Sequence, residues 1–108
     1  MEDARALYKE GFDHFVGERL EAAIDCYRRA VAADPQLAIA WSGLAMALAQ
    51  SGDLDGAIET GRRVVELEPE DPLAHTSLSI FLQRQGRIPE AEEERAIAMR
   101  LSLRDSQE

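Results

Sequence analysis

Apolar residues recur along the chain at the spacing of α-helices, in segments separated by turn residues. In the middle of the chain, Trp41, Leu44 and Leu48 lie three and four positions apart, which places them on one face of a helix with 3.6 residues per turn. Gly52 then suits the left-handed conformation that often ends a helix, and Asp53 suits the start of the next one. The pattern predicts two antiparallel helices joined by a short turn.

The same pattern returns with a period of 34 residues. Pro35 recurs as Pro69, and each proline is expected to stop one helix before the next repeat begins. The offset also relates Leu44 to Leu78, Leu48 to Leu82 and Gly52 to Gly86, and it gives the complete triples Ala23, Ala57, Ala91 and Leu20, Leu54, Ile88. A helix pair cannot bury its apolar face alone, so this period predicts stacked pairs with boundaries at about residues 4–37, 38–71 and 72–105.

These positions resemble the tetratricopeptide repeat, a 34-residue helix-turn-helix unit. The second copy carries the resemblance most fully, with Trp41, Leu44, Ala45, Leu48, Gly52, Leu54, Ala57 and Pro69. The resemblance covers nearly the whole chain. It implies an all-α fold, a right-handed superhelical solenoid of three repeats and six antiparallel helices, in a single domain over residues 1–108.

Repeat two departs from the pattern at one helix-interior position. Gly61 stands where repeat one has Tyr27 and where the family usually has an aromatic residue. A glycine there weakens the helix by roughly 1 kcal/mol and leaves a gap. We expect Phe81, from the first helix of repeat three, to fill that gap.

Repeat three departs from the pattern in a way that is typical of the last repeat of a solenoid. Glu92 and Arg95 occupy positions that would face a following repeat, and polar residues suit a terminal repeat that has no neighbour. Leu103 replaces the terminating proline, so the last helix is expected to continue to about Leu103.

The resemblance also implies a binding surface, because the first helices of such repeats line a concave groove. The family's ligand-contacting positions fall on Arg5, Tyr8, Phe12, Phe15 and Val16 in repeat one, on Ile39, Ser42, Met46, Ala49 and Gln50 in repeat two, and on Leu73, Thr76, Ile80, Gln83 and Arg84 in repeat three. Some members hold a C-terminal carboxylate there with Lys, Asn and Arg. This chain instead has Tyr8, Phe12, Gly43, Leu73 and Ser77 at the clamp positions, so that use is not supported.

The helix expected from about Leu37 to Gln50 supports the same surface independently of the family. It carries no charge and is apolar on both faces, whereas the solenoid buries only one of them. We therefore expect a non-catalytic interaction module, an adaptor, scaffold or chaperone-like protein that binds an apolar or amphipathic segment of a partner. One alternative is a homo-oligomer formed through this face or through the C-terminal helix. Another is that the acidic second helices bind a basic partner.

Charge and motifs narrow the remaining classes of function. The 12 basic against 21 acidic residues give a net charge of −9, which disfavours nucleic acid and anionic membranes as partners. No apolar run is long enough to insert into a membrane, and the acidic N-terminus is unlike a secretory signal, so a cytoplasmic location is expected. Phosphate-binding loops and catalytic motifs are missing from the sequence, and no enzyme activity or cofactor is expected.

The few residues able to bind metal or react are interpreted as structural. Cys26 is the single cysteine, which excludes an internal disulfide, and with only His14 and His75 no zinc ligand set is expected. Both histidines fall on core positions of the repeat. Cys26 is interpreted as a semi-buried filler, although neighbouring arginines would favour a lower pKa and a redox role.

Overall fold

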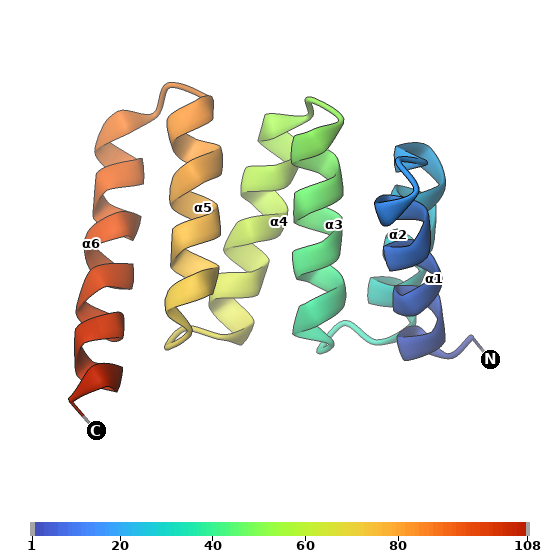
Figure 1. Cartoon of the computed structure of the whole chain (residues 1–108), viewed down its shortest axis with the longest axis horizontal. Coiled ribbons are helices and arrows are strands. Elements are labelled where there is room, and N and C mark those ends of the chain that lie inside the picture. The colour runs from blue at the N-terminus through green and yellow to red at the C-terminus, as the bar shows by residue number, and fades with distance from the viewer. Residues whose placement is uncertain (1, 108) are drawn as a thin grey trace.

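The chain forms six helices and no strand within residues 2–107, the range described by the computed structural model (Figure 1). This confirms the predicted all-α repeat fold. The helices are α1 (Ala4–Val16), α2 (Leu20–Ala33), α3 (Ala38–Gln50), α4 (Leu54–Leu67), α5 (Pro72–Arg84) and α6 (Ile88–Ser106). In these residues, no helix is long and apolar enough to cross a membrane.

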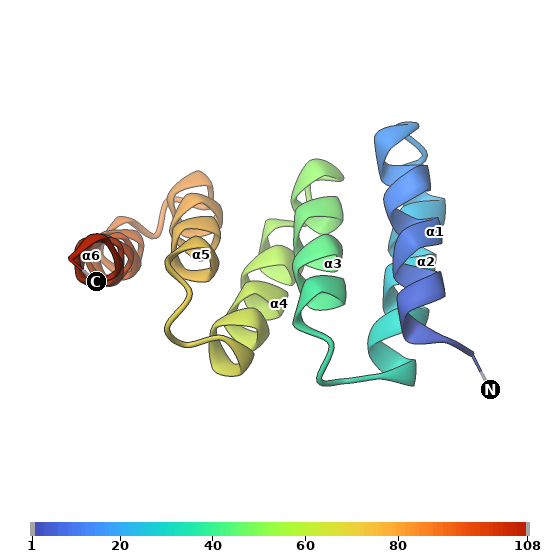
Figure 2. The same ribbon diagram turned by 60° about the horizontal axis from the view of Figure 1, so that its bottom comes forward.

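Neighbouring helices are paired within each repeat, and the pairs stack in chain order. Helix α1 packs on α2, α3 on α4, and α5 on α6, while α2 contacts α3 and α4 contacts α5. Figures 1 and 2 show the resulting row, with the two chain ends at opposite ends of the molecule. The molecule measures 40 × 33 × 21 Å, so it is a short solenoid.

The turn inside each repeat uses one residue in the left-handed backbone conformation. Gly52 (φ 94°) and Gly86 (φ 85°) adopt it without steric cost, as the sequence predicted for Gly52. In repeat one the equivalent residue is Glu18, at φ 62°. A side chain there crowds its own backbone, at a cost of roughly 1–2 kcal/mol.

Replacing Glu18 with glycine is therefore expected to stabilise the protein. Relief of the backbone strain exceeds the added flexibility of the unfolded chain, so Glu18→Gly should raise the free energy of unfolding by about 0.5–1 kcal/mol in urea melts. Arg28→Gly is the control, because it puts glycine in the middle of helix α2 at an exposed position and should lower stability by roughly 1 kcal/mol. A neutral or destabilising Glu18→Gly would contradict this explanation of the turn.

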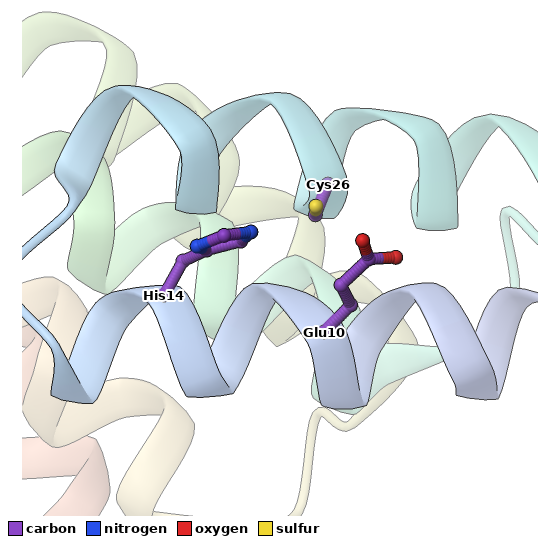
Figure 3. A group of neighbouring side chains, drawn as sticks. All are labelled: Glu10, His14 and Cys26. Carbon is purple, nitrogen blue, oxygen red and sulfur yellow. The ribbon is translucent and has the colours of Figure 1, made fainter.

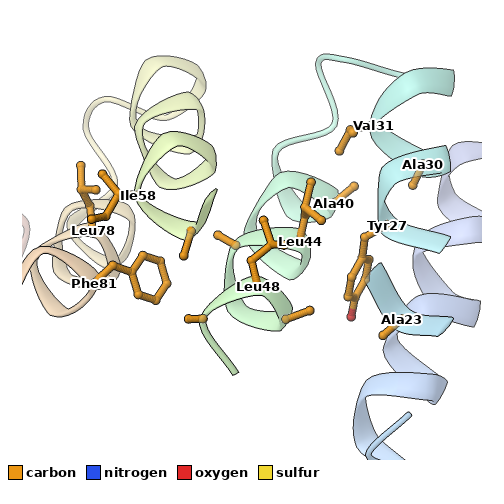
Figure 4. Packing of buried hydrophobic residues seen from close by; sticks show 14 of the residues in the cluster. Ala23, Tyr27, Ala30, Val31, Ala40, Leu44, Leu48, Ile58, Leu78 and Phe81 are labelled. Atoms are coloured by element: carbon orange, nitrogen blue, oxygen red, sulfur yellow. The ribbon is translucent and has the colours of Figure 1, made fainter. Parts of the chain in front are cut away.

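Small and large residues alternate in the core that joins the repeats (Figure 4). Ala23, Ala57 and Ala91 are buried and let the two helices of each repeat approach closely. Tyr27 is fully buried between repeats one and two, where its ring packs against two glycines. A Cβ added at Gly11 or Gly43 would lie 2.8 or 2.7 Å from that ring, so both positions require glycine.

Between repeats two and three the packing differs, as the sequence suggested. Phe81 is buried, and its ring lies 3.5 Å from the position that a Cβ of Gly61 would take. Its ring points toward α4 in Figure 4. An aromatic residue from the next helix thus covers part of the space that Tyr27 fills in repeat one.

The C-terminal end is polar at the two expected positions but carries apolar residues as well. Glu92 and Arg95 are exposed and lie 3.6 Å apart as an ion pair. Helix α6 continues three residues beyond the predicted end at Leu103. Met99 and Leu103 are 55% and 56% exposed, so this end is only partly the polar cap that the sequence indicated.

The two histidines differ, although both were placed in the core from the sequence. His75 is buried, its Nε2 donates to the carbonyl oxygen of Pro69 (2.8 Å), and its Nδ1 pairs with a carboxylate oxygen of Glu94 (2.7 Å). It therefore ties α5 to α6 and to the turn before α5. His14 is only half-buried and accepts a hydrogen bond from Nε of Arg19 (2.9 Å).

Candidate functional site

Three adjoining pockets form a groove along the face built by α1, α3 and α5. The Phe12 pocket (about 260 Å³) is lined by Tyr8, Phe12, Phe15, Tyr27, Ile39, Ser42, Gly43 and Met46. The Gly61 pocket (about 350 Å³) is lined by Ile39, Ser42, Ala45, Met46, Gly61, Val64, Asp71, Leu73, Ala74, Ser77 and Phe81. The Arg84 pocket (about 190 Å³) is lined by Met46, Ala49, Gln50, Ser77, Ile80, Phe81 and Arg84. Met46 belongs to all three, so it lies at the centre of the groove.

Large apolar side chains remain open to solvent along this groove. Phe12, Met46 and Ile80 are 48%, 48% and 47% exposed. They are open because α3 and its neighbours bury one apolar face in the solenoid core and have no further layer on the other face. A monomer rarely leaves such side chains adjoining one another unless they meet a partner.

Most of the groove residues expected from the sequence line these pockets, but four do not. Arg5, Val16 and Gln83 are exposed and lie outside the three pockets. Thr76 lines a separate pocket with Arg95, Ala98, Met99 and Ser102 of α6. Thr76 therefore lies on the side of α5 that faces α6. Ala49 lines the groove but is buried, which leaves little of it for a partner to contact.

Sequence reasoning missed the residues that form the floor of the groove. Tyr27 and Gly61 belong to the second helices of their repeats, α2 and α4, and line the groove pockets from there. Phe81 was expected to fill the gap at Gly61 but not to line the groove. The departure at Gly61 was the available signal, because a missing aromatic side chain predicts an empty space.

The groove carries two charged residues, at opposite ends of α5. Asp71 caps the helix, since its carboxylate accepts a hydrogen bond from the backbone N–H of Leu73 (2.9 Å). Arg84 lies in the last turn, is exposed and forms no ion pair within residues 2–107. Arg84 is thus a positive group free to meet an acidic side chain of a partner.

The largest pocket, about 640 Å³, lies on another face, between α2, α3 and α4. Its wall mixes acidic and basic side chains, and these partly satisfy one another: Arg63 lies 3.2 Å from Glu66 and stacks over the ring of Trp41 at 5.8 Å. Trp41 also donates its indole N–H to the carbonyl oxygen of Pro35 (2.8 Å). Arg28 and Glu59 also line this pocket and form no ion pair within residues 2–107, so the charges of this face are paired only in part.

Glu10, His14 and Cys26 form a cluster that sequence reasoning did not foresee (Figure 3). Their ligand atoms lie within 4.8 Å of one another; Glu10 and His14 are one turn apart on α1, and Cys26 reaches them from α2. The hydrogen bond from Arg19 occupies the lone pair of Nδ1 of His14, so the neutral ring carries its proton on Nε2. Neither nitrogen then offers a lone pair to a metal, and we assign no metal site to this cluster.

The surroundings of Cys26 shift the pKa of its thiol upward. Burial raises its pKa, the carboxylate of Glu10 raises it further, and Arg29 opposes these effects only in part. Burial likewise raises the pKa of Tyr27 to about 12. Arg29 thus lowers the pKa of Cys26 as expected from the sequence, but burial and Glu10 outweigh it, which supports the interpretation of Cys26 as a filler.

Cys26 should consequently react slowly with thiol reagents. Because the reactive species is the thiolate and the side chain is buried, alkylation by iodoacetamide at pH 8 should be at least about tenfold slower in the folded protein than in urea. A Ser102→Cys variant, with a second thiol at an exposed position of α6, provides the reference rate. Equal rates for the two thiols in the folded variant would show that Cys26 is accessible and ionised.

Comparisons with known proteins identify the family. A family model described as tetratricopeptide repeat matches residues 8–72, more than half of the chain, whereas no curated protein sequence matches. The crystal structure of MamA superposes with a TM-score of 0.94 at 25% identity, over 98% of this chain and 62% of that chain. This chain therefore spans less than two thirds of MamA.

Two further solved structures share the fold at lower identity. The second TPR of Spaghetti (RPAP3), solved with the HSP90 peptide SRMEEVD, has a TM-score of 0.87 and 23% identity and covers 93% of both chains. A chain of the CopN-Scc3 complex also has a TM-score of 0.87, with 22% identity over 91% of this chain and 58% of that chain. The family model and the repeat architecture agree, and this chain belongs to the tetratricopeptide repeat family.

Proposed function

We propose that this protein is a non-catalytic interaction module that binds an apolar or amphipathic segment of a partner protein in the groove formed by α1, α3 and α5. The observation that carries the proposal is the open apolar surface of Phe12, Met46 and Ile80 around three adjoining pockets. Side chains of this kind act as anchors when a partner covers them. Met46, with its flexible thioether, adapts to ligands of irregular shape.

The energetics require a ligand that occupies more than one pocket. Fully burying one large apolar side chain contributes about 1.5–3 kcal/mol, and the groove residues are already about half covered. Micromolar binding needs about 8 kcal/mol beyond the entropy lost on association. A segment that reaches from the Phe12 pocket to the Arg84 pocket meets this need, whereas a single inserted side chain does not.

Solved proteins of the same fold support a role in binding. The RPAP3 domain was solved with a peptide, and the CopN-Scc3 structure is a complex. The chemistry proposed here differs from that of an acidic peptide tail. The groove is mostly apolar, and its clamp positions hold residues such as Tyr8, Phe12 and Leu73 in place of basic ones.

The alternative is a self-assembling unit that uses α6. The observation that favours it is that Met99 and Leu103, two large apolar side chains of α6, are exposed. Light scattering over a hundredfold range of protein concentration separates the two. A constant mass of 12.0 kDa supports the monomeric module, and a mass that rises with concentration supports assembly.

A random-peptide selection at physiological salt tests the proposal. We expect enriched peptides to be apolar or amphipathic, and the peptides should shift backbone amide resonances of α1, α3 and α5 more than those of α2, α4 and α6. Enrichment of Lys- and Arg-rich peptides whose binding disappears in high salt would instead place the function on the acidic helices. That result would overturn the groove as the binding surface.

A further inference from the structure

Three positions that meet between neighbouring repeats differ in size from one interface to the next. Between repeats one and two they are Gly11, Tyr27 and Gly43, and the tyrosine ring fills the space between the two glycines. Shifted by 34 residues they become Ala45, Gly61 and Ser77. The second interface therefore has no large side chain at any of the three positions.

The missing ring leaves an opening that faces the groove. All three of the small residues line the Gly61 pocket, which at about 350 Å³ is the largest of the three groove pockets. Phe81 covers one wall but does not close the space, since it lines the pocket itself. The rest of the lining is mainly apolar, and Ser42, Ser77 and Asp71 add polar groups to it. An aromatic ring with a polar edge suits this lining.

The positive charge of Arg84 indicates which ligand group should lie near that ring. Ser77 lies in both the Gly61 and the Arg84 pockets, and Arg84 follows it seven residues later on α5. Seven helical residues span about 10 Å, a distance that about three residues of an extended peptide cover. Because Arg84 is exposed and has no carboxylate partner within residues 2–107, a ligand carboxylate three residues from the ring would pair with it.

We infer that the Gly61 pocket receives an aromatic side chain of the partner segment, and that an acidic residue about three positions away pairs with Arg84. The inference rests on the proposed groove function and specifies the chemistry of its ligand. The partner thus supplies between repeats two and three the ring that Tyr27 supplies between repeats one and two. The sequence motif that results is an aromatic residue and an acidic residue three apart, in either order.

Two short peptides test this directly by titration against the amide spectrum of the whole protein. The two peptides, acetyl-Tyr-Ala-Ala-Glu-amide and acetyl-Glu-Ala-Ala-Tyr-amide, present the motif in both chain directions. One of them should shift the backbone amide resonances of Gly61, Ala45 and Ser77. Replacing its Tyr with Ala should weaken binding at least about tenfold, because the aromatic burial is lost. Replacing its Glu with Gln should weaken binding about two- to fivefold at low salt and not at 1 M salt.

The second part of the test uses protein variants whose own side chain fills the Gly61 pocket. Gly61→Met and Ser77→Met place a flexible side chain in the pocket from α4 and from α5, and each should abolish the peptide shifts. Two variants are used because either one alone could disturb folding, which the amide spectrum reports. Ser102→Met is the matched control, since this serine is exposed on α6 outside the groove.

The outcomes separate this inference from the groove function itself. Shifts confined to the pocket and lost in the filled variants support it. Unchanged binding of the Tyr-to-Ala peptides, or unchanged binding to Ser77→Met, would overturn it. If peptides from the random selection still bind the groove of Ser77→Met, the groove function stands and only the assignment of this pocket fails. If the selected peptides bind neither the groove of Ser77→Met nor the groove of the wild-type protein, the proposed function fails as well.

Discussion

A Met46→Glu variant is expected to lose at least about a hundredfold in affinity for a groove ligand while remaining folded. Met46 lines all three pockets, so a carboxylate there lies beside every part of the bound segment. Binding would bury that charge among apolar side chains with no partner, at a cost of several kcal/mol. The free protein does not incur this cost, because the side chain at position 46 is about half exposed to water. Calorimetric titration with a selected peptide measures the loss.

Met99→Glu is the matched control for that experiment. It makes the same substitution at a methionine of similar exposure, 55% against 48%, on α6 and outside the groove. We expect wild-type affinity from Met99→Glu and unchanged urea melts from both variants. If both variants lose binding equally, the surface in use is not the groove. If only Met99→Glu changes the mass in solution, the terminal helix is an assembly surface.

The largest expected change in stability comes from Phe81→Ala, at about 3–5 kcal/mol of unfolding free energy. Phe81 is 3% exposed and packs on the helix that carries Gly61, so its removal joins a new cavity to a space already lacking an aromatic ring. Neighbouring side chains have little freedom to collapse into the gap, because α4 and α5 are fixed by their own partners. The whole free energy of unfolding of a small domain is only about 5–15 kcal/mol, so this variant should be barely stable.

Ile80→Ala is the control for the packing explanation. It removes a large apolar residue next to Phe81 in sequence, but one that is 47% exposed on the groove side. A loss of less than about 1 kcal/mol is expected, measured by the same urea melts at one protein concentration. A loss of less than 1 kcal/mol for Phe81→Ala would show that Gly61 is covered by some other means.

The fold could be predicted from the sequence because its signals are local and repeated. Gly52 and Pro69 each mark the end of a helix, and the recurring leucines mark its buried face. Because these signals return every 34 residues, they are compatible only with a stack of helix pairs. The exposed groove residues were also predictable, because an uncharged helix such as α3 has one more apolar face than its neighbours can cover.

The remaining features depend on which residues meet in space, and a single sequence does not give this. His75 pairs with Glu94, nineteen residues later, only because α5 and α6 lie antiparallel at this register. Thr76 lies outside the groove, on the side of α5 that faces α6, and the repeat pattern by itself does not reveal this. The Gly61 pocket needed both the missing ring and the position of Phe81, and the latter was only a hypothesis from the sequence.

Site-specific photo-cross-linking tests the central claim most directly. A benzophenone side chain placed at Ile80 in the groove, or at Met99 on the terminal helix, reports which surface a natural partner touches in a cell extract. If the groove binds a partner, cross-links from position 80 should map to one apolar or amphipathic segment of a different protein, and position 99 should give no cross-link to that segment. Cross-links to the partner from position 99 and not from position 80 would contradict the central claim.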